Sequence, residues 1–240
     1  MKKILLILTA MLMLVPSLKA QSIWTSVEIG GKIIDGFSMY GDLKYRTHDK
    51  VASSARFSAG LNLDYKICPY AKTGAGYVFL EEQTQDKVTG KGNIIPAYWY
   101  SRHRAFYYIT GIYSWRGLEF SLRERYQYTF RDELAVPKFA SDGTTPKNDE
   151  IVPVDHKHTL RSRLGIEYKF KKPGIKPYFT AELYNDLAHK FMIDKARYTV
   201  GTEYKINKKN SIELYYRYVD DTDIDDPDTH VIGFGYKLKL

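Results

Sequence analysis

Apolar and polar residues alternate along most of this chain, with the period of two that is typical of β-strands. The clearest run spans Arg56 to Ile67, where Phe57 and every second residue after it are apolar and the positions between them are polar. The pattern recurs in residues 118–130, 160–170, 197–206 and 212–219, with Glu124 as the one charge on the apolar face of its segment. The last eleven residues alternate as far as Leu240. About eleven segments reach the 9–11 residues that a tilted strand needs to cross a bilayer.

The connections between these segments alternate between short and long. Tight turns are predicted at 35–36, 68–69, 115–117, 172–174 and 207–210, and longer polar stretches at 48–54, 83–96, 131–158, 186–194 and 220–229. Short turns at one end and long loops at the other are typical of outer-membrane barrels. The stretch 131–158, with three prolines, is the longest, and we expect a mobile loop there.

The predicted fold class is therefore all-β, a single antiparallel transmembrane β-barrel of 10–12 strands with short periplasmic turns and long external loops. An odd number is awkward, because eleven strands cannot place both termini on one side of the membrane and bacterial barrels are usually even-numbered. Either the segment from Trp24 to Ile34 is not a full strand, which leaves ten, or a long loop hides a hairpin, which gives twelve.

The N-terminus predicts a secretory signal peptide over residues 1–20, with the barrel over residues 21–240. Met1-Lys2-Lys3 precedes an apolar core that runs from Ile4 to Val15, and a small residue, Ala20, precedes the predicted cut. No later apolar run is long enough for a transmembrane helix. A single cysteine excludes an internal disulfide. We expect the bacterial outer membrane as the location, with outer-membrane lipid and lipopolysaccharide as partners.

Charge argues against nucleic acid as a partner. Without Lys2, Lys3 and Lys19 the formal charge falls from +8 to +5, and the basic residues are spread along the strands instead of clustering on one face. Aromatic residues make up 15% of the chain and include 21 Tyr. We expect most of them to form girdles at the membrane interfaces. Only inward-facing rings, such as those of Tyr40 and Tyr215, remain for stacking on a sugar.

Over its whole mature length the chain resembles an outer-membrane barrel family catalogued as domain of unknown function 2490. The features that carry the resemblance are Trp24 in the first strand, Arg102-His103-Arg104 at one strand entry, the Arg-x-Arg pairs Arg123/Arg125 and Arg161/Arg163, and the Gly-aromatic terminal strand. The resemblance implies a barrel but no activity. The terminal strand also resembles the C-terminal insertion signal of bacterial barrels, with Leu240 where an aromatic residue is usual. We therefore expect the barrel-assembly machinery to recognise it.

Charged residues on the polar face of the strands form the most distinctive candidate site. By alternation, the residues expected to line the lumen as a charge ladder are Lys44, Arg46, Arg56, Arg104, Arg123, Arg125, Arg161, Arg163, Arg197, Arg217, Glu119, Glu167, Glu203 and Glu213, together with Asp42, Asp64 and Glu182. One interpretation is a salt-bridge network that fills a narrow barrel. The other is an Arg-lined path for anions, because Arg recognises carboxylates and phosphates in a bidentate manner.

Three functions follow, none of which needs a cofactor. The first is a narrow channel or passive transporter for small anionic solutes. The second is a non-conducting barrel that acts through its external loops. The third is a lipid-modifying enzyme, for which the candidates are His156 and His158 with Asp155 and Thr159, His103 with Ser101, and His48 with Asp49. A weak metal site is also predicted at Asp221, Asp223, Asp225 and Asp228, whose alternate carboxylates suit Ca²⁺.

Overall fold

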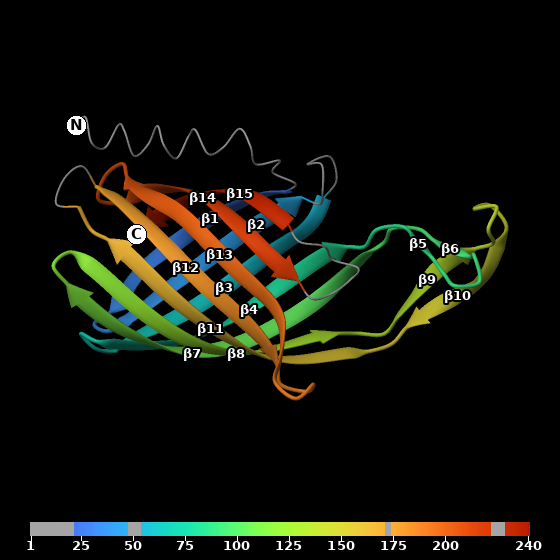
Figure 1. The fold of residues 1–240 in the computed structure, drawn as a ribbon, viewed down its shortest axis with the longest axis horizontal. Helices are drawn as coiled ribbons and strands as arrows, with labels where there is room; N and C mark the ends of the chain where they lie inside the picture. The colour runs from blue at the N-terminus through green and yellow to red at the C-terminus, as the bar shows by residue number, and fades with distance from the viewer. Residues whose placement is uncertain (1–21, 48–53, 171–173, 222–228) are drawn as a thin grey trace.

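The computed structural model describes residues 22–47, 54–170, 174–221 and 229–240, and within them eleven long strands close into a barrel (Figure 1). The barrel strands are β1 (Ser22–Ile34), β2 (Phe37–Thr47), β3 (Ser54–Cys68), β4 (Ala71–Gln83), β7 (Trp99–Trp115), β8 (Leu118–Arg131), β11 (Asp155–Tyr168), β12 (Ile175–Asp186), β13 (Met192–Lys205), β14 (Asn210–Asp221) and β15 (Thr229–Lys239). Every alternating segment of the sequence lies in one of them, except for one or two residues at the ends of some segments, so the predicted all-β barrel is confirmed.

The barrel closes through a parallel seam. Neighbouring strands pair antiparallel around the wall, but β1 pairs parallel with β15, from Ser22 opposite Val231 to Gly30 opposite Lys239. The segment from Trp24 to Ile34 is a full strand, and the described residues hold no twelfth barrel strand. The parity argument for ten or twelve strands was therefore wrong, because a parallel first-to-last pair closes an odd number of strands.

The two ends of the barrel differ as the loop lengths predict. At one end, called here the short-turn end, β7 and β8 are joined by Arg116 and Gly117, both at positive φ (48° and 90°). Two such residues are typical of the tight turns that match the twist of a β-hairpin. The C-terminus lies at this end, where the Leu240 amide donates to the Gly30 carbonyl at 3.0 Å. The opposite end, where β1 begins, is called the long-loop end.

The distribution of apolar residues is the reverse of that in a soluble protein. Large apolar side chains cover the outside of the wall, for example Leu43 and Leu61 at 50% exposure and Ile109 at 55%. The polar residues that alternate with them along each strand point into the barrel. Eight apolar or aromatic side chains of the described barrel strands are nevertheless buried, and these are Trp24, Leu80, Phe106, Tyr108, Tyr184, Ala196, Val219 and Val231.

Four further strands form a second sheet that projects from the long-loop end (Figure 1). They are β5 (Lys87–Val88), β6 (Ile94–Ile95), β9 (Leu134–Phe139) and β10 (Pro146–Val152), and this projection is called the arm. The expectation of an irregular loop over residues 131–158 was wrong. Two of its prolines sit where a sheet tolerates them: Pro146 begins β10, and Pro137 lies at a register shift in the β9–β10 pairing.

The predicted signal peptide, residues 1–20, lies outside the described residues and stays a prediction. Among the described residues no helix is long and apolar enough to cross a membrane. Cys68 is free and exposed, at the short-turn end of β3.

Candidate functional site: the charged lumen

The structure separates the predicted charge ladder into two zones. All of its members are carried on the inward face of the wall, but the acidic residues Glu119, Glu167, Glu203 and Glu213 lie towards the short-turn end. Most of the arginines lie in the middle of the barrel. We use the name arginine cluster for Arg46, Arg104, Arg123, Arg125, Arg161, Arg163, Arg197 and Arg217.

The acidic zone is neutralised by lysines. Glu203 lies 3.0 Å from the Nζ atoms of both Lys176 and Lys237, and Lys237 is also 3.3 Å from Glu213. Glu119 pairs with Lys169 at 2.5 Å, and Glu167 lies 3.6 Å from Lys176. Towards the short-turn end, the lumen carboxylates are therefore paired with lysines, as in a salt-bridge network.

In the arginine cluster, one carboxylate serves three guanidinium groups. Glu182 is 3% exposed and accepts hydrogen bonds from Arg161 at 2.6 Å. Arg163 and Arg123 approach the same carboxylate at 3.7 Å and 3.9 Å. Arg123 lies on β8 and Glu182 on β12, with β11 between them, so the barrel's curvature and strand stagger bring them together. The three arginines and Glu182 together therefore carry a net charge of +2.

The other five arginines of the cluster form no ion pair with any carboxylate that the structure describes. They are Arg46, Arg104, Arg125, Arg197 and Arg217. Hydroxyl groups and aromatic rings hold them instead. Arg104 donates to Thr129 at 2.9 Å, and the Arg125 guanidinium lies 3.5 Å from the centroid of the Phe106 ring. Contacts of this kind fix a guanidinium but leave its charge in place.

Three of these arginines surround one indole. The guanidinium carbons of Arg46, Arg217 and Arg197 lie 3.9, 5.0 and 5.3 Å from the Trp24 ring. The ring is fixed in turn, because its Nε1–H donates to the Ser22 hydroxyl at 3.0 Å and this hydroxyl donates to a carbonyl of β2 at 2.6 Å. Three like charges are therefore held around one rigid side chain.

Buried donors in the cluster lack acceptors as well. In the described protein, no acceptor reaches the buried Nε–H groups of Arg123, Arg125, Arg161, Arg163 and Arg197. Buried N–H groups are nearly always hydrogen-bonded in folded proteins. Together with the excess charge, these donors suit an anion or anion-bridging water in the lumen.

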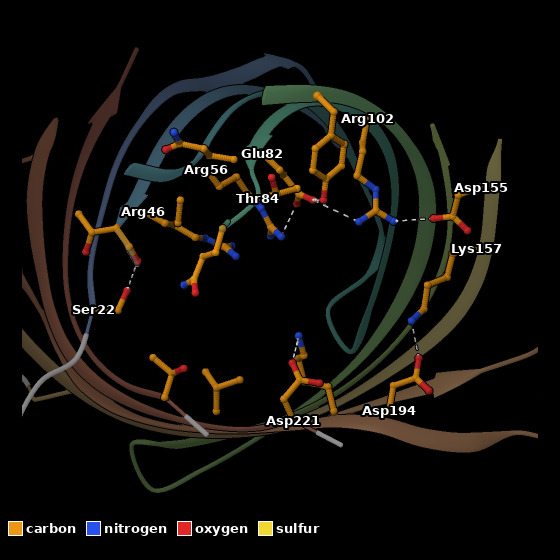
Figure 2. A pocket seen from close by; sticks show the side chains of 18 of the residues that line it. Ser22, Arg46, Arg56, Glu82, Thr84, Arg102, Asp155, Lys157, Asp194 and Asp221 are labelled. Atoms are coloured by element: carbon orange, nitrogen blue, oxygen red, sulfur yellow. Dashed lines mark hydrogen bonds and ion pairs between the residues drawn. The ribbon is translucent and has the colours of Figure 1, made fainter. Parts of the chain in front are cut away.

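A cavity of about 1110 Å³ opens above the cluster at the long-loop end. Figure 2 shows Arg46, Arg56 and Arg102 pointing into it from the wall. Most charges of this upper region are paired. Glu82, 5% exposed, contacts Arg56 and lies 3.2 Å from Arg102, and Lys157 lies 2.6 Å from Asp194. Trp24, Arg46 and Arg197 line the cavity as well, so the cavity reaches the arginine cluster.

Lys44, the one lysine of the predicted ladder, pairs with Asp42 at 2.8 Å. The predicted metal site falls mostly outside the described residues. Asp223, Asp225 and Asp228 lie in the stretch 222–228, whereas Asp221 ends β14 and contacts Lys195. In the described part of the chain, no group of three His, Cys, Asp or Glu side chains is placed to hold a metal ion. The site stays a prediction.

The structure does not assemble the residues proposed for an enzyme. His156 and His158 point outward from β11, whereas Asp155 and Thr159 of the same strand point into the barrel. The Ser101 hydroxyl donates to Glu81, and the His103 Nδ1 atom is hydrogen-bonded to the Tyr77 hydroxyl at 2.5 Å. These contacts leave no hydrogen-bonded chain from nucleophile to base to carboxylate at either place. His48 and Asp49 lie outside the described residues.

Sequence reasoning missed several residues of the lumen. Arg102 shares the inward face with Arg104, so alternation alone predicts its direction. Glu82 is the penultimate residue of β4, next to the predicted loop 83–96, and the sequence reasoning did not include it. Trp24 gives no such signal, because an inward tryptophan breaks the rule that apolar residues face outward.

Comparisons with known proteins agree with this architecture. The beta domain of the Bordetella autotransporter BrkA is similar with a TM-score of 0.59 at 12% identity, covering 88% of each chain. The NanC porin is similar with a TM-score of 0.51 at 12% identity, covering 89% of this chain and 91% of that one. At this identity the likeness shows the fold alone. No curated protein matches the sequence.

The sequence itself matches a family description, "Protein of unknown function (DUF2490)", over residues 21–229. This range contains ten of the barrel strands entire and the whole of the arm, and it ends at the first residue of β15. Fold and sequence agree, and the chain belongs to the DUF2490 family.

Proposed function

We propose that this protein is an outer-membrane barrel whose lumen is a narrow passage for small anionic solutes. The observation that carries the proposal is the set of five lumen arginines without an ion pair among the described residues, two of which, Arg46 and Arg197, line the cavity. A ring of uncompensated guanidinium groups attracts anions and repels cations. The paired lysines and carboxylates at the short-turn end add little net charge to this field.

The outer surface supports placement in the outer membrane. Large apolar and aromatic side chains cover the outside of the wall, as in the outer-membrane barrels that face lipid. In this placement lipid and lipopolysaccharide surround the wall, the short turns face the periplasm, and β15 presents the strand that the assembly machinery would recognise. The separated histidines and acidic residues favour a protein that binds or conducts over one that catalyses.

A flux assay tests the proposal with two solutes that share a six-carbon chain, anionic gluconate and neutral sorbitol. In proteoliposomes we expect gluconate to enter faster than sorbitol, and the double substitution Arg125→Gln/Arg217→Gln to reduce that preference. A matched control is Lys32→Gln, which removes an exposed charge at the short-turn end. Equal entry of the two solutes into wild-type vesicles would contradict the proposal.

The arm supports a second function, binding through the external surface. Its four strands project from the long-loop end as an ordered sheet, with Val136 (2% exposed) and Ile95 (8%) packed inside it. An ordered projection of this kind offers a surface to a partner outside the cell. Deletion of residues 132–154 should then abolish partner binding but leave gluconate flux. Partner binding that survives the deletion would favour the channel alone.

A further inference from the structure

The histidines of the outer wall are confined to one end of the barrel. His103, His156, His158 and His230 all point outward near the long-loop end. Among the described residues, the outward rings at the short-turn end are Phe, Tyr and Trp, such as the pairs Phe37–Tyr65 and Tyr168–Phe170. An interface girdle needs aromatic rings at both ends but gives no reason for imidazoles at only one.

Each of these histidines is held by a tyrosine in the same way. The Nδ1 atoms of His103, His158, His156 and His230 lie 2.5, 2.7, 2.6 and 2.6 Å from the hydroxyls of Tyr77, Tyr126, Tyr128 and Tyr216. We call these four pairs the Tyr-His belt. A phenol O–H that donates to Nδ1 leaves the imidazole proton on Nε2. In this tautomer the rings of His103, His156 and His158 present an Nε2–H donor away from the tyrosine.

Two of the pairs form a continuous patch across β8 and β11. The His158 ring lies 5.0 Å from Tyr128, and the His156 ring lies 5.1 Å from Phe130 and stacks on Tyr128. Rings in mutual contact keep the two imidazoles in place. The patch therefore offers two oriented N–H donors side by side on the lipid-facing surface.

We propose that the Tyr-His belt binds the phosphate groups of lipid headgroups at the long-loop end. Phosphate oxygens accept hydrogen bonds from N–H donors. Two outward carboxylates near the patch are each fixed by a serine, since Ser162 donates to Glu124 at 2.6 Å and Ser101 donates to Glu81. The inference rests on the membrane placement proposed above but not on conduction.

The test uses lipid vesicles of phosphatidylcholine that contain the full barrel and a small amount of spin-labelled lipid. Electron spin resonance separates lipid held at the protein wall from free lipid and gives association constants, relative to the host lipid, for phosphatidic acid and for diacylglycerol, which has the same acyl chains but no phosphate. We expect wild type to prefer phosphatidic acid over diacylglycerol by about fivefold, the effect of one net hydrogen bond. The double substitution His156→Phe/His158→Phe keeps both rings but removes the N–H donors, and we expect it to lower this preference towards equality.

A matched control, Tyr113→Phe/Tyr204→Phe, alters exposed aromatic side chains nearer the short-turn end and should leave the preference unchanged. Heat-dependent gel mobility confirms that each variant is folded. Held lipid without any preference in wild type, or a preference that survives the double histidine substitution, would overturn the inference and leave the channel proposal intact. Absence of held lipid would overturn the membrane placement and the inference with it.

Discussion

Replacing Glu182 with glutamine removes the one carboxylate that serves three arginines. Glu182 is 3% exposed and Arg161 is 16% exposed, so the pair is buried, and breaking a buried pair by removing one partner costs about 3–5 kcal/mol. Four groups lose a negatively charged neighbour at once. They are the guanidinium groups of Arg161, Arg163 and Arg123 and the Tyr184 hydroxyl, which donates to Glu182 at 3.2 Å. We therefore expect Glu182→Gln to lower the free energy of unfolding by about 3–5 kcal/mol.

The assay is reversible urea unfolding of the barrel in vesicles, followed by tryptophan fluorescence. Glu119→Gln is the control, because that residue lies in an exposed pair with Lys169 and such pairs contribute about 0–1 kcal/mol. If the cluster binds anions, an anion at 100 times its dissociation constant should restore about 2.7 kcal/mol to the variant. A variant as stable as wild type would refute the assignment of Glu182 as the central counter-charge of the cluster.

Three further predictions follow from the structure. Arg125→Gln should leave stability unchanged or raise it, since Arg125 has no ion pair to lose in the described protein and is repelled by its neighbours; a loss of several kcal/mol in the same urea assay would show that the cluster is structural. Gly233→Val should impair folding, because a Cβ at Gly233 would lie 1.9 Å from the Tyr215 ring; Tyr215→Ser in the same chain should restore heat-dependent gel mobility, and failure to do so would place the defect elsewhere. In the arm, hydrogen bonds from the Thr145 hydroxyl and from the amides of Thr145 and Thr144 lower the pKa of Asp142 to about 2. The turn is therefore stabilised above the ordinary pKa of about 4 and loses that stabilisation as the pH falls towards 2. The amide exchange rates of Thr144 in wild type and in Asp142→Asn should differ at neutral pH and converge at low pH. A difference that stays constant with pH would contradict this origin.

The strand pattern was predictable from the sequence because each residue of this wall faces either the outside or the lumen of the barrel. That choice is local, so alternation alone placed every member of the charge ladder on the inward face. The partner of each charge is not local. Arg123 meets Glu182 across an intervening strand, and this proximity depends on the curvature and stagger of the closed barrel.

The remaining errors have equally specific causes. Eleven strands lie within the predicted range of 10–12, but the parity argument against eleven failed because it assumed an antiparallel closure, whereas Ser22 to Gly30 pairs parallel with β15. The arm was taken for loops because its two stretches are polar and the longer one holds three prolines, and the register shift that accommodates Pro137 is invisible in the sequence. Trp24 faces inward because three guanidinium groups surround it, a contact that no pattern along a single strand reveals.

The most direct test of the account is the reversal potential of single channels of the refolded wild-type protein in a planar bilayer under a salt gradient. The account predicts discrete conductance steps whose reversal potential has the sign of an anion-selective pore, and a shift towards zero in Arg125→Gln/Arg217→Gln. Cation-selective steps, or a silent bilayer with protein shown by gel mobility to be folded, would contradict the claim that the arginine cluster forms a path for anions.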